Sequence, residues 1–120
     1  MQENRQKVIA EICQIIEEKK GENIEVFNLE KTDYFVDFVV IATALIDRHA
    51  MALLEELKKQ LKAKGESFFH IDEENPDWIV VDLGDIIIHL FTENQRKKFN
   101  LEEFLQKLLQ ESARKKCIEN

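Results

Sequence analysis

The segment that decides how this chain folds is Trp78–Phe91, which reads Trp-Ile-Val-Val-Asp-Leu-Gly-Asp-Ile-Ile-Ile-His-Leu-Phe. Two runs rich in β-branched residues flank Gly84-Asp85, and a glycine at the first central position of a two-residue loop is typical of a type II′ hairpin turn. We therefore predict an antiparallel hairpin. Its register pairs Trp78 with Phe91, Ile79 with Leu90, Val80 with His89, Val81 with Ile88, Asp82 with Ile87 and Leu83 with Ile86.

This register divides the hairpin into two faces, because side chains alternate along a strand and directly paired residues share a face. The first face is entirely aliphatic and predicts a core surface: Ile79, Val81, Leu83, Ile86, Ile88 and Leu90. The second face adds two aromatics, an acid and an imidazole, as recognition surfaces do: Trp78, Val80, Asp82, Ile87, His89 and Phe91. An equally favoured alternative is that a helix of the same chain covers this second face.

The composition is that of one globular domain: 120 residues, of which 44% are hydrophobic and 34% charged. We expect this domain over residues 1–111 and a polar C-terminal tail over residues 112–120. No apolar run approaches the roughly 20 residues of a membrane helix, and the charged N-terminal segment lacks the apolar stretch of a signal peptide. The expected location is the cytoplasm, where Cys13 and Cys117 stay reduced.

The net charge of −7 is concentrated around the hairpin. Residues 65–95 contain eight acidic side chains and no Lys or Arg. An acidic field repels phosphate backbones and favours a basic partner, although acidic loops also serve solubility alone.

Hydrophobic periodicity predicts the other elements. Helices are expected over residues 3–20, 47–64 and 100–111, with Asp47 as the cap of the second and Asn100 and Glu103 as a capping box in the third. Further strands are expected over residues 24–29, 38–42 and 67–71, the middle one buried on both faces. Residues 92–99 are expected to form a polar connection, and the tail beyond Glu111 to fray. The order predicts an α+β fold with a single mixed β-sheet of about five strands and helices packed mainly on one face.

The sequence gives no positive sign of an enzyme, a metal site or a cofactor. His49, His70 and His89 do not occur in a ligand spacing, Asp85 is explained as a turn residue, and three glycines provide no phosphate-binding loop. The alternative is a remnant nucleotidyltransferase or metal-dependent hydrolase that uses His70, His89 and Asp82.

Four segments resemble the ribosomal silencing factor RsfS (Iojap) family: residues 37–43, 47–49, 78–91 and 99–102. The resemblance runs over roughly residues 7–109, and the hairpin is its most specific part. It implies a nucleotidyltransferase-like fold without catalytic carboxylates. It also implies a factor that binds ribosomal protein L-fourteen on the large ribosomal subunit, blocks joining of the small subunit and so represses translation, or that acts in large-subunit biogenesis.

Carried over by position, the resemblance implies a partner-binding surface formed by Trp78, Asp82, Asp85, His89 and Phe91, with Asp47 and Arg48 as a second patch. The chain departs from the family pattern at Ala44, Ile46, Asn75, Asn100 and Leu105.

Two further contacts are expected. An exposed apolar sheet face favours a symmetric homodimer through the same face when no ribosome is present. Basic residues give a secondary contact with ribosomal RNA: Lys58, Lys59, Lys62, Lys64, Arg96, Lys97 and Lys98.

Overall fold

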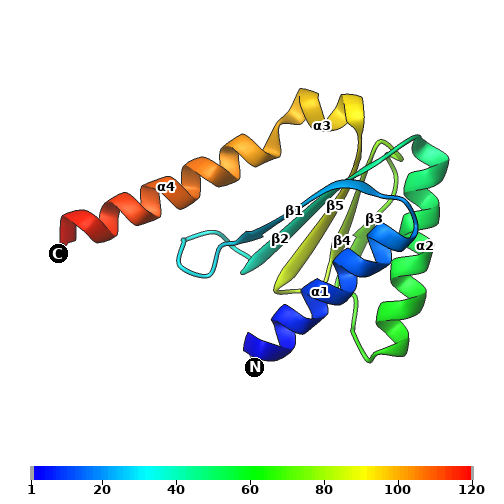
Figure 1. Ribbon diagram of the computed structural model, residues 1–120, viewed down its shortest axis with the longest axis horizontal. Coiled ribbons are helices and arrows are strands. Elements are labelled where there is room, and N and C mark those ends of the chain that lie inside the picture. The colour runs from blue at the N-terminus through cyan, green and yellow to red at the C-terminus, as the bar shows by residue number, and fades with distance from the viewer. Residues whose placement is uncertain (1, 120) are drawn as a thin grey trace.

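A computed structural model describes the backbone of residues 2–119 and the side chains of residues 5–113. Its elements in chain order are α1 (Gln2–Glu18), β1 (Glu22–Asn28), β2 (Phe38–Ala44), α2 (Asp47–Ala63), β3 (His70–Asp72), β4 (Trp78–Asp82), β5 (Ile86–Thr92), α3 (Glu93–Phe99) and α4 (Leu101–Glu119) (Figure 1). The predicted α+β fold with a single mixed sheet of five strands is confirmed. None of the helices within residues 2–119 combines the length and apolarity needed to cross a bilayer.

The sheet has the strand order β1-β2-β5-β4-β3, in which β2 and β5 are parallel and the other neighbours antiparallel. The predicted hairpin register is confirmed from the pair Trp78–Phe91 to the pair Asp82–Ile87. Gly84 has a φ of +98°, the left-handed backbone that the first central position of a type II′ turn requires. Every residue of β2 is buried, as its unbroken apolar run predicts.

The helices α1 and α2 pack on one face of the sheet and bury the larger core. All six residues of the predicted aliphatic face belong to this core, which confirms that interpretation. The apolar stripe of α2 supplies the opposing surface through Ala50, Leu53, Leu54, Leu57 and Leu61. This face of the sheet therefore holds the fold together.

The second face is covered only in part. The start of α4 buries Leu101 and Leu105 in a smaller core with Val39, Ile41 and Phe91. Figure 1 shows α4 leaving α3 at the top, passing β1 and continuing beyond the sheet. The β4 side of this face, with Trp78 and Val80, is only partly buried.

Several predicted boundaries are wrong. Residues 93–99 form α3 rather than a polar connection, with Glu93 in its first turn and basic side chains in its last turn, as the helix dipole favours. Asn100 ends α3 with a φ of +53°, and its backbone N–H donates to the Arg96 carbonyl oxygen at 2.9 Å, not to Glu103 as the predicted capping box requires. Its side-chain amide donates to Glu103 Oε2 at 2.7 Å. The N-cap of α2 is Ile46, and Asp47 is its first helical residue.

Two further predicted segments also differ from the structure. The third strand is confined to His70–Asp72 because only these residues pair with β4, opposite Val80–Asp82. The last helix continues past Glu111 to Glu119 instead of fraying, because its residues carry no helix-breaking Gly or Pro.

Candidate interaction surface

Trp78 is half-buried, and its one polar side-chain atom is satisfied inside the protein. Its indole Nε1 donates a hydrogen bond to His89 Nδ1 at 2.9 Å, between paired neighbours of β4 and β5. Burial lowers the pKa of His89 to about 4, so the ring is neutral near pH 7 and Nδ1 is free to accept. The indole is therefore fixed in orientation before any partner arrives.

A second aromatic ring extends the surface of Trp78. The Phe99 ring at the end of α3 lies 4.4 Å from the Trp78 ring, centroid to centroid, and Phe99 is 49% exposed. We call the pair Trp78–Phe99 the aromatic step. The sequence interpretation missed Phe99 because it placed this residue in a connection, although a lone large aromatic after a charged segment was a usable signal.

Two predicted contact residues are not accessible. The expectation of an exposed surface is wrong for Phe91, which is 0% exposed, and for His89, which is 8% exposed. Phe91 lies beneath its own chain, in the smaller core with Leu101 and Leu105 of α4 and stacked on Trp78. The alternative interpretation, a covering helix, therefore holds for Phe91, while Trp78 stays half-buried.

Asp82 and Asp85 lie at the other end of the hairpin from the aromatic step. The Asp82 Oδ1 accepts from the Gly84 N–H at 2.7 Å and so stabilises the turn. The Asp85 carboxylate lies 2.6 Å from Arg5 Nε, and Arg5 Nη1 lies 3.1 Å from Glu66. Trp78 and Asp82 are about 13 Å apart along the strand, so the predicted carboxylates and the tryptophan do not form one cluster.

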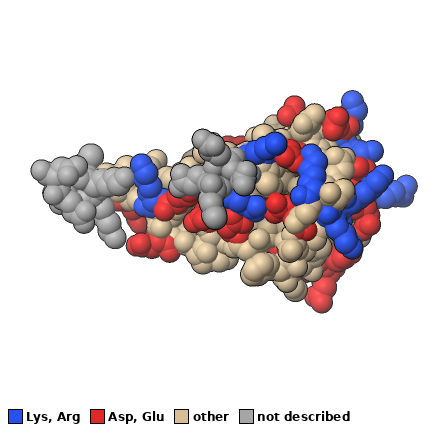
Figure 2. Space-filling model, turned by 90° about the horizontal axis from the view of Figure 1, so that it is seen from below, with Lys and Arg blue, Asp and Glu red and all other residues tan. Residues whose placement is uncertain are grey.

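The end of the molecule that carries this ion network has no single sign of charge. Acidic and basic side chains intermingle when the molecule is seen from below in Figure 2. Lys64 and Glu11 form a further ion pair there, linking the end of α2 to α1. These pairs attach α1 to the rest of the fold. Asp85 is one of the paired carboxylates, and its role in partner binding stays a prediction.

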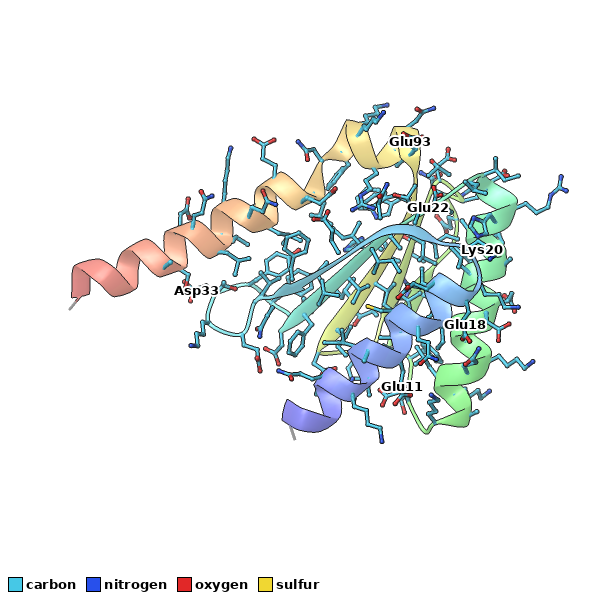
Figure 3. All side chains as sticks on the ribbon, in the orientation of Figure 1. Glu11, Glu18, Lys20, Glu22, Asp33 and Glu93 are labelled. Carbon is cyan, nitrogen blue, oxygen red and sulfur yellow. The ribbon has the colours of Figure 1, made fainter. Side chains whose placement is uncertain are left out.

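Asp47 and Arg48 are exposed on the first turn of α2, at the same end of the sheet as Trp78. They line a cavity of about 490 Å³ with Met51, Glu73, Glu74 and Pro76, so this turn adjoins the acidic loop of residues 73–77. Glu22 and Glu93 lie at this end as well (Figure 3). The geometry thus brings the second predicted patch near the aromatic step, and its role in binding stays a prediction.

The alternative metal site does not assemble. His70 is exposed on the edge strand β3 and is paired with Asp82, whereas His89 is buried on β5. Among the described residues, no group of three or more His, Cys, Asp and Glu side chains could hold a metal ion.

Arg96 is a buried structural residue, which corrects its expected contact with ribosomal RNA. It is 8% exposed and lines a cavity of about 600 Å³ between β1, α3 and α4. Its guanidinium donates to the Asn23 backbone oxygen at 2.6 Å and to Thr43 Oγ1 at 2.7 Å. Glu25 and Glu102 each accept from it at 2.8 Å. On α3, only Lys97 and Lys98 remain exposed for a nucleic acid.

Comparisons with known proteins give one consistent result. The family model described as ribosomal silencing factor during starvation matches residues 2–119. The ribosomal silencing factor RsfS of Halalkalibacterium halodurans is 26% identical over 101 residues, which cover 83% of this chain and 86% of that protein. A mouse protein named mitochondrial assembly of ribosomal large subunit protein 1 is 25% identical over 96 residues, covering 77% of this chain and 42% of that protein. The fold is similar to a crystal structure of a Chromobacterium violaceum protein, with a TM-score of 0.80, 22% identity and coverage of 84% of this chain and 85% of that chain.

Proposed function

Because this chain belongs to the family of ribosomal silencing factors, we propose that it binds ribosomal protein L-fourteen on the large subunit through the aromatic step and blocks joining of the small subunit. The family is named for a regulatory role rather than a chemical reaction. Large-subunit binding is supported by the name of the mouse relative, which refers to assembly of that subunit. A function in large-subunit assembly and one in silencing would use the same surface.

The observation that carries the proposal is the aromatic pair, half-buried Trp78 and exposed Phe99, beside an acidic loop. The Trp78 N–H already has its partner in His89, so a docking protein can cover the ring without leaving a polar group unsatisfied. Large aromatic side chains that lose contact with water are the usual energetic centres of protein interfaces. The aromatic step therefore fits the role of anchor.

The charge of the acidic loop indicates which kind of partner this surface binds. Glu73, Glu74 and Asp77 are all exposed and adjoin the start of β4, which carries Trp78. Charges at the rim of an interface mainly steer the encounter and fix orientation. A basic ribosomal protein meets this surface favourably, whereas the phosphates of ribosomal RNA are repelled.

The proposed mechanism is occupation of a surface. A domain whose Cα radius of gyration is 14.7 Å, seated where the two subunits meet, excludes the small subunit sterically. No chemical step and no cofactor takes part. The protein then acts in the cytoplasm, on free large subunits.

Two secondary contacts belong to the same proposal. The half-buried Trp78 and the exposed Phe99 give a symmetric homodimer an apolar contact when no ribosome is present. Lys97 and Lys98 contact ribosomal RNA at the edge of the bound surface. A sedimentation-equilibrium series over protein concentration, run with and without Phe99→Ser, tests the dimer.

Sucrose-gradient fractionation of a lysate tests the main function. The expected result is protein in the fractions of free large subunits and none in those of joined ribosomes. Equal amounts in both sets of fractions would overturn steric exclusion, and absence from both would overturn large-subunit binding.

A further inference from the structure

Two large aliphatic side chains stand exposed where β2 turns into α2. Leu45 is 63% exposed and Ile46 is 55% exposed. Neither belongs to a core cluster of the fold. A single exposed leucine needs no explanation, but two adjacent ones at the functional end of the sheet form an apolar protrusion.

The backbone holds this protrusion in place. The Leu45 N–H donates to His49 Nδ1 at 2.9 Å, and His49 Nε2 lies 2.7 Å from the Lys19 carbonyl oxygen. The carbonyl can only accept, so Nε2 carries the proton and Nδ1 is the acceptor. Through His49 the loop is tied to the end of α1, so a partner finds the backbone that carries the two side chains already in place.

Ile46 occupies a position where another residue type would stabilise the helix. It is the N-cap of α2, with extended φ and ψ of −147° and 172°, and it forms no side-chain cap hydrogen bond. Ser, Thr, Asp and Asn are favoured at N-caps because their side-chain oxygens accept from the first backbone N–H groups. The exposed isoleucine thus adds neither a cap nor a core contact to the fold.

The charges around the protrusion indicate what it contacts. Asp47 follows it directly, and Glu73 and Glu74 line the same cavity as Asp47, with Arg48 as the one basic side chain among the lining residues. On the α1 side, Lys19 forms an ion pair with Glu56 at 3.5 Å. An apolar contact with an acidic rim fits a basic protein and disfavours RNA.

The protrusion and the aromatic step lie at the same end of the sheet. Ala44, which precedes Leu45, is paired with Thr92, and the Thr92 N–H donates to the Asp77 carbonyl at 3.0 Å. Neighbouring strands lie about 4.8 Å apart, so Ala44 and Asp77 are roughly 10 Å apart. One partner surface of ordinary size spans both contacts.

We propose that Leu45 and Ile46 form a second anchor, which inserts into an apolar hollow on the same basic ribosomal protein that covers the aromatic step. This inference rests on the proposed function and adds a binding element to it. The interface then has two apolar contacts, with the acidic loop of residues 73–77 between them.

The substitution Ile46→Ser separates binding from stability. It supplies the missing N-cap, so the melting temperature rises by about 4 °C. It also removes an apolar contact, so affinity for purified large subunits falls about tenfold. Leu45→Ser, which keeps the backbone bond to His49, lowers affinity by a similar factor. The matched control is Phe35→Ser, because Phe35 is 72% exposed but lies in the loop of residues 29–37.

The comparison with Trp78→Ala distinguishes the second anchor from the proposed function. If Trp78→Ala loses binding while Ile46→Ser and Leu45→Ser bind like the parent, the second anchor is overturned and the proposed function stands. If all three variants bind like the parent, both anchors are overturned, whereas a parent protein that does not bind large subunits overturns the proposed function itself. An equal loss for Phe35→Ser would also overturn the second anchor, because binding would then follow exposed apolar area in general.

Discussion

At the scale of single residues, Trp78 shows how the fold prepares a contact. The hydrogen bond to His89 fixes the ring, and the neighbouring Phe99 extends it at the surface. The apolar area is thus displayed in one orientation, which reduces the entropy lost on binding.

We expect Trp78→Ala to weaken large-subunit binding by about 2 kcal/mol, or roughly 30-fold, because truncation removes the central ring of the interface. Co-sedimentation titrations with purified large subunits measure the change. Circular dichroism serves as the control for folding, since Trp78 lies at the partly buried margin of the smaller core. Parent-like co-sedimentation would remove Trp78 from the interface.

His89 makes the stability of the protein depend on pH. Burial lowers its pKa from 6.5 to about 4, so the unfolded chain binds a proton more readily than the folded one. Its contribution to stability is complete above about pH 6.5 and is lost as the pH falls toward 4.

The free energy of unfolding is therefore expected to decrease between about pH 6.5 and pH 4. Urea unfolding at a series of pH values measures this slope. His89→Gln should flatten it, whereas His70→Gln, at an exposed position, should keep it. Identical slopes for the parent and His89→Gln would contradict the assignment of this pH dependence to His89.

At the scale of elements, α3 depends on contacts that are distant in the sequence. Arg96 joins it to Asn23 and Glu25 of β1, Thr43 of β2 and Glu102 of α4. A buried arginine with four partners fixes the angle at which α3 meets the sheet, and with it the place of Phe99.

Arg96→Ala is expected to destabilise the fold by about 3 kcal/mol, because it leaves one buried and three partly buried acceptors without their donor. Arg96→Lys recovers little, since an ammonium cannot reproduce the fork of the guanidinium. Chemical denaturation measures both changes. Lys97→Ala is the matched control: its ion pair with Glu93 is exposed, so the expected change is below about 0.5 kcal/mol. A loss for Lys97→Ala as large as that for Arg96→Ala would contradict this role.

The separation in sequence between contacting residues explains which elements can be predicted from the sequence. The hairpin register follows from the β-branched runs and Gly84, and these signals are local. α3 has no apolar stripe, because its buried residue is a charged one whose partners lie on other elements. The existence of α3 and the burial of Phe91 depend on that packing, so the sequence pattern does not contain them.

The predicted site, too, has a part that follows from local sequence signals and a part that depends on the fold. Alternation correctly placed Trp78, Asp82 and His89 on one face of the hairpin, but it gives no distance along the strand. Asp82 and Asp85 consequently belong to the turn and its ion network. Strand alternation and the resemblance to a known family both identified Trp78, whereas the physical pattern of the sequence gave no reason to choose Leu45 or Ile46.

At the scale of the whole molecule, the two ends of the sheet carry different features. The hairpin-turn end carries the ion network of Arg5, Glu66 and Asp85, which attaches α1. The opposite end carries the aromatic step, the start of α2 and the acidic loop of residues 73–77. The ion network that attaches α1 and the surface proposed for recognition therefore lie at opposite ends of the sheet.

Neutralising the acidic loop is expected to slow association more than it speeds dissociation, because rim charges act on the encounter. The double variant Glu73→Gln, Glu74→Gln should lower the association rate several-fold at low salt and weaken its dependence on salt. Surface-immobilised large subunits allow both rates to be measured. Glu55→Gln is the control, since Glu55 is an exposed acid further along α2. An unchanged salt dependence in the double variant would contradict steering by this loop.

The most direct test of the central claim is reassociation of purified large and small subunits in the presence of this protein. We predict that joined ribosomes decrease as the protein is added, that the protein sediments with the large subunits left free, and that Trp78→Ala has lost this effect. Undiminished joining of the subunits while the protein is bound to them would contradict the account.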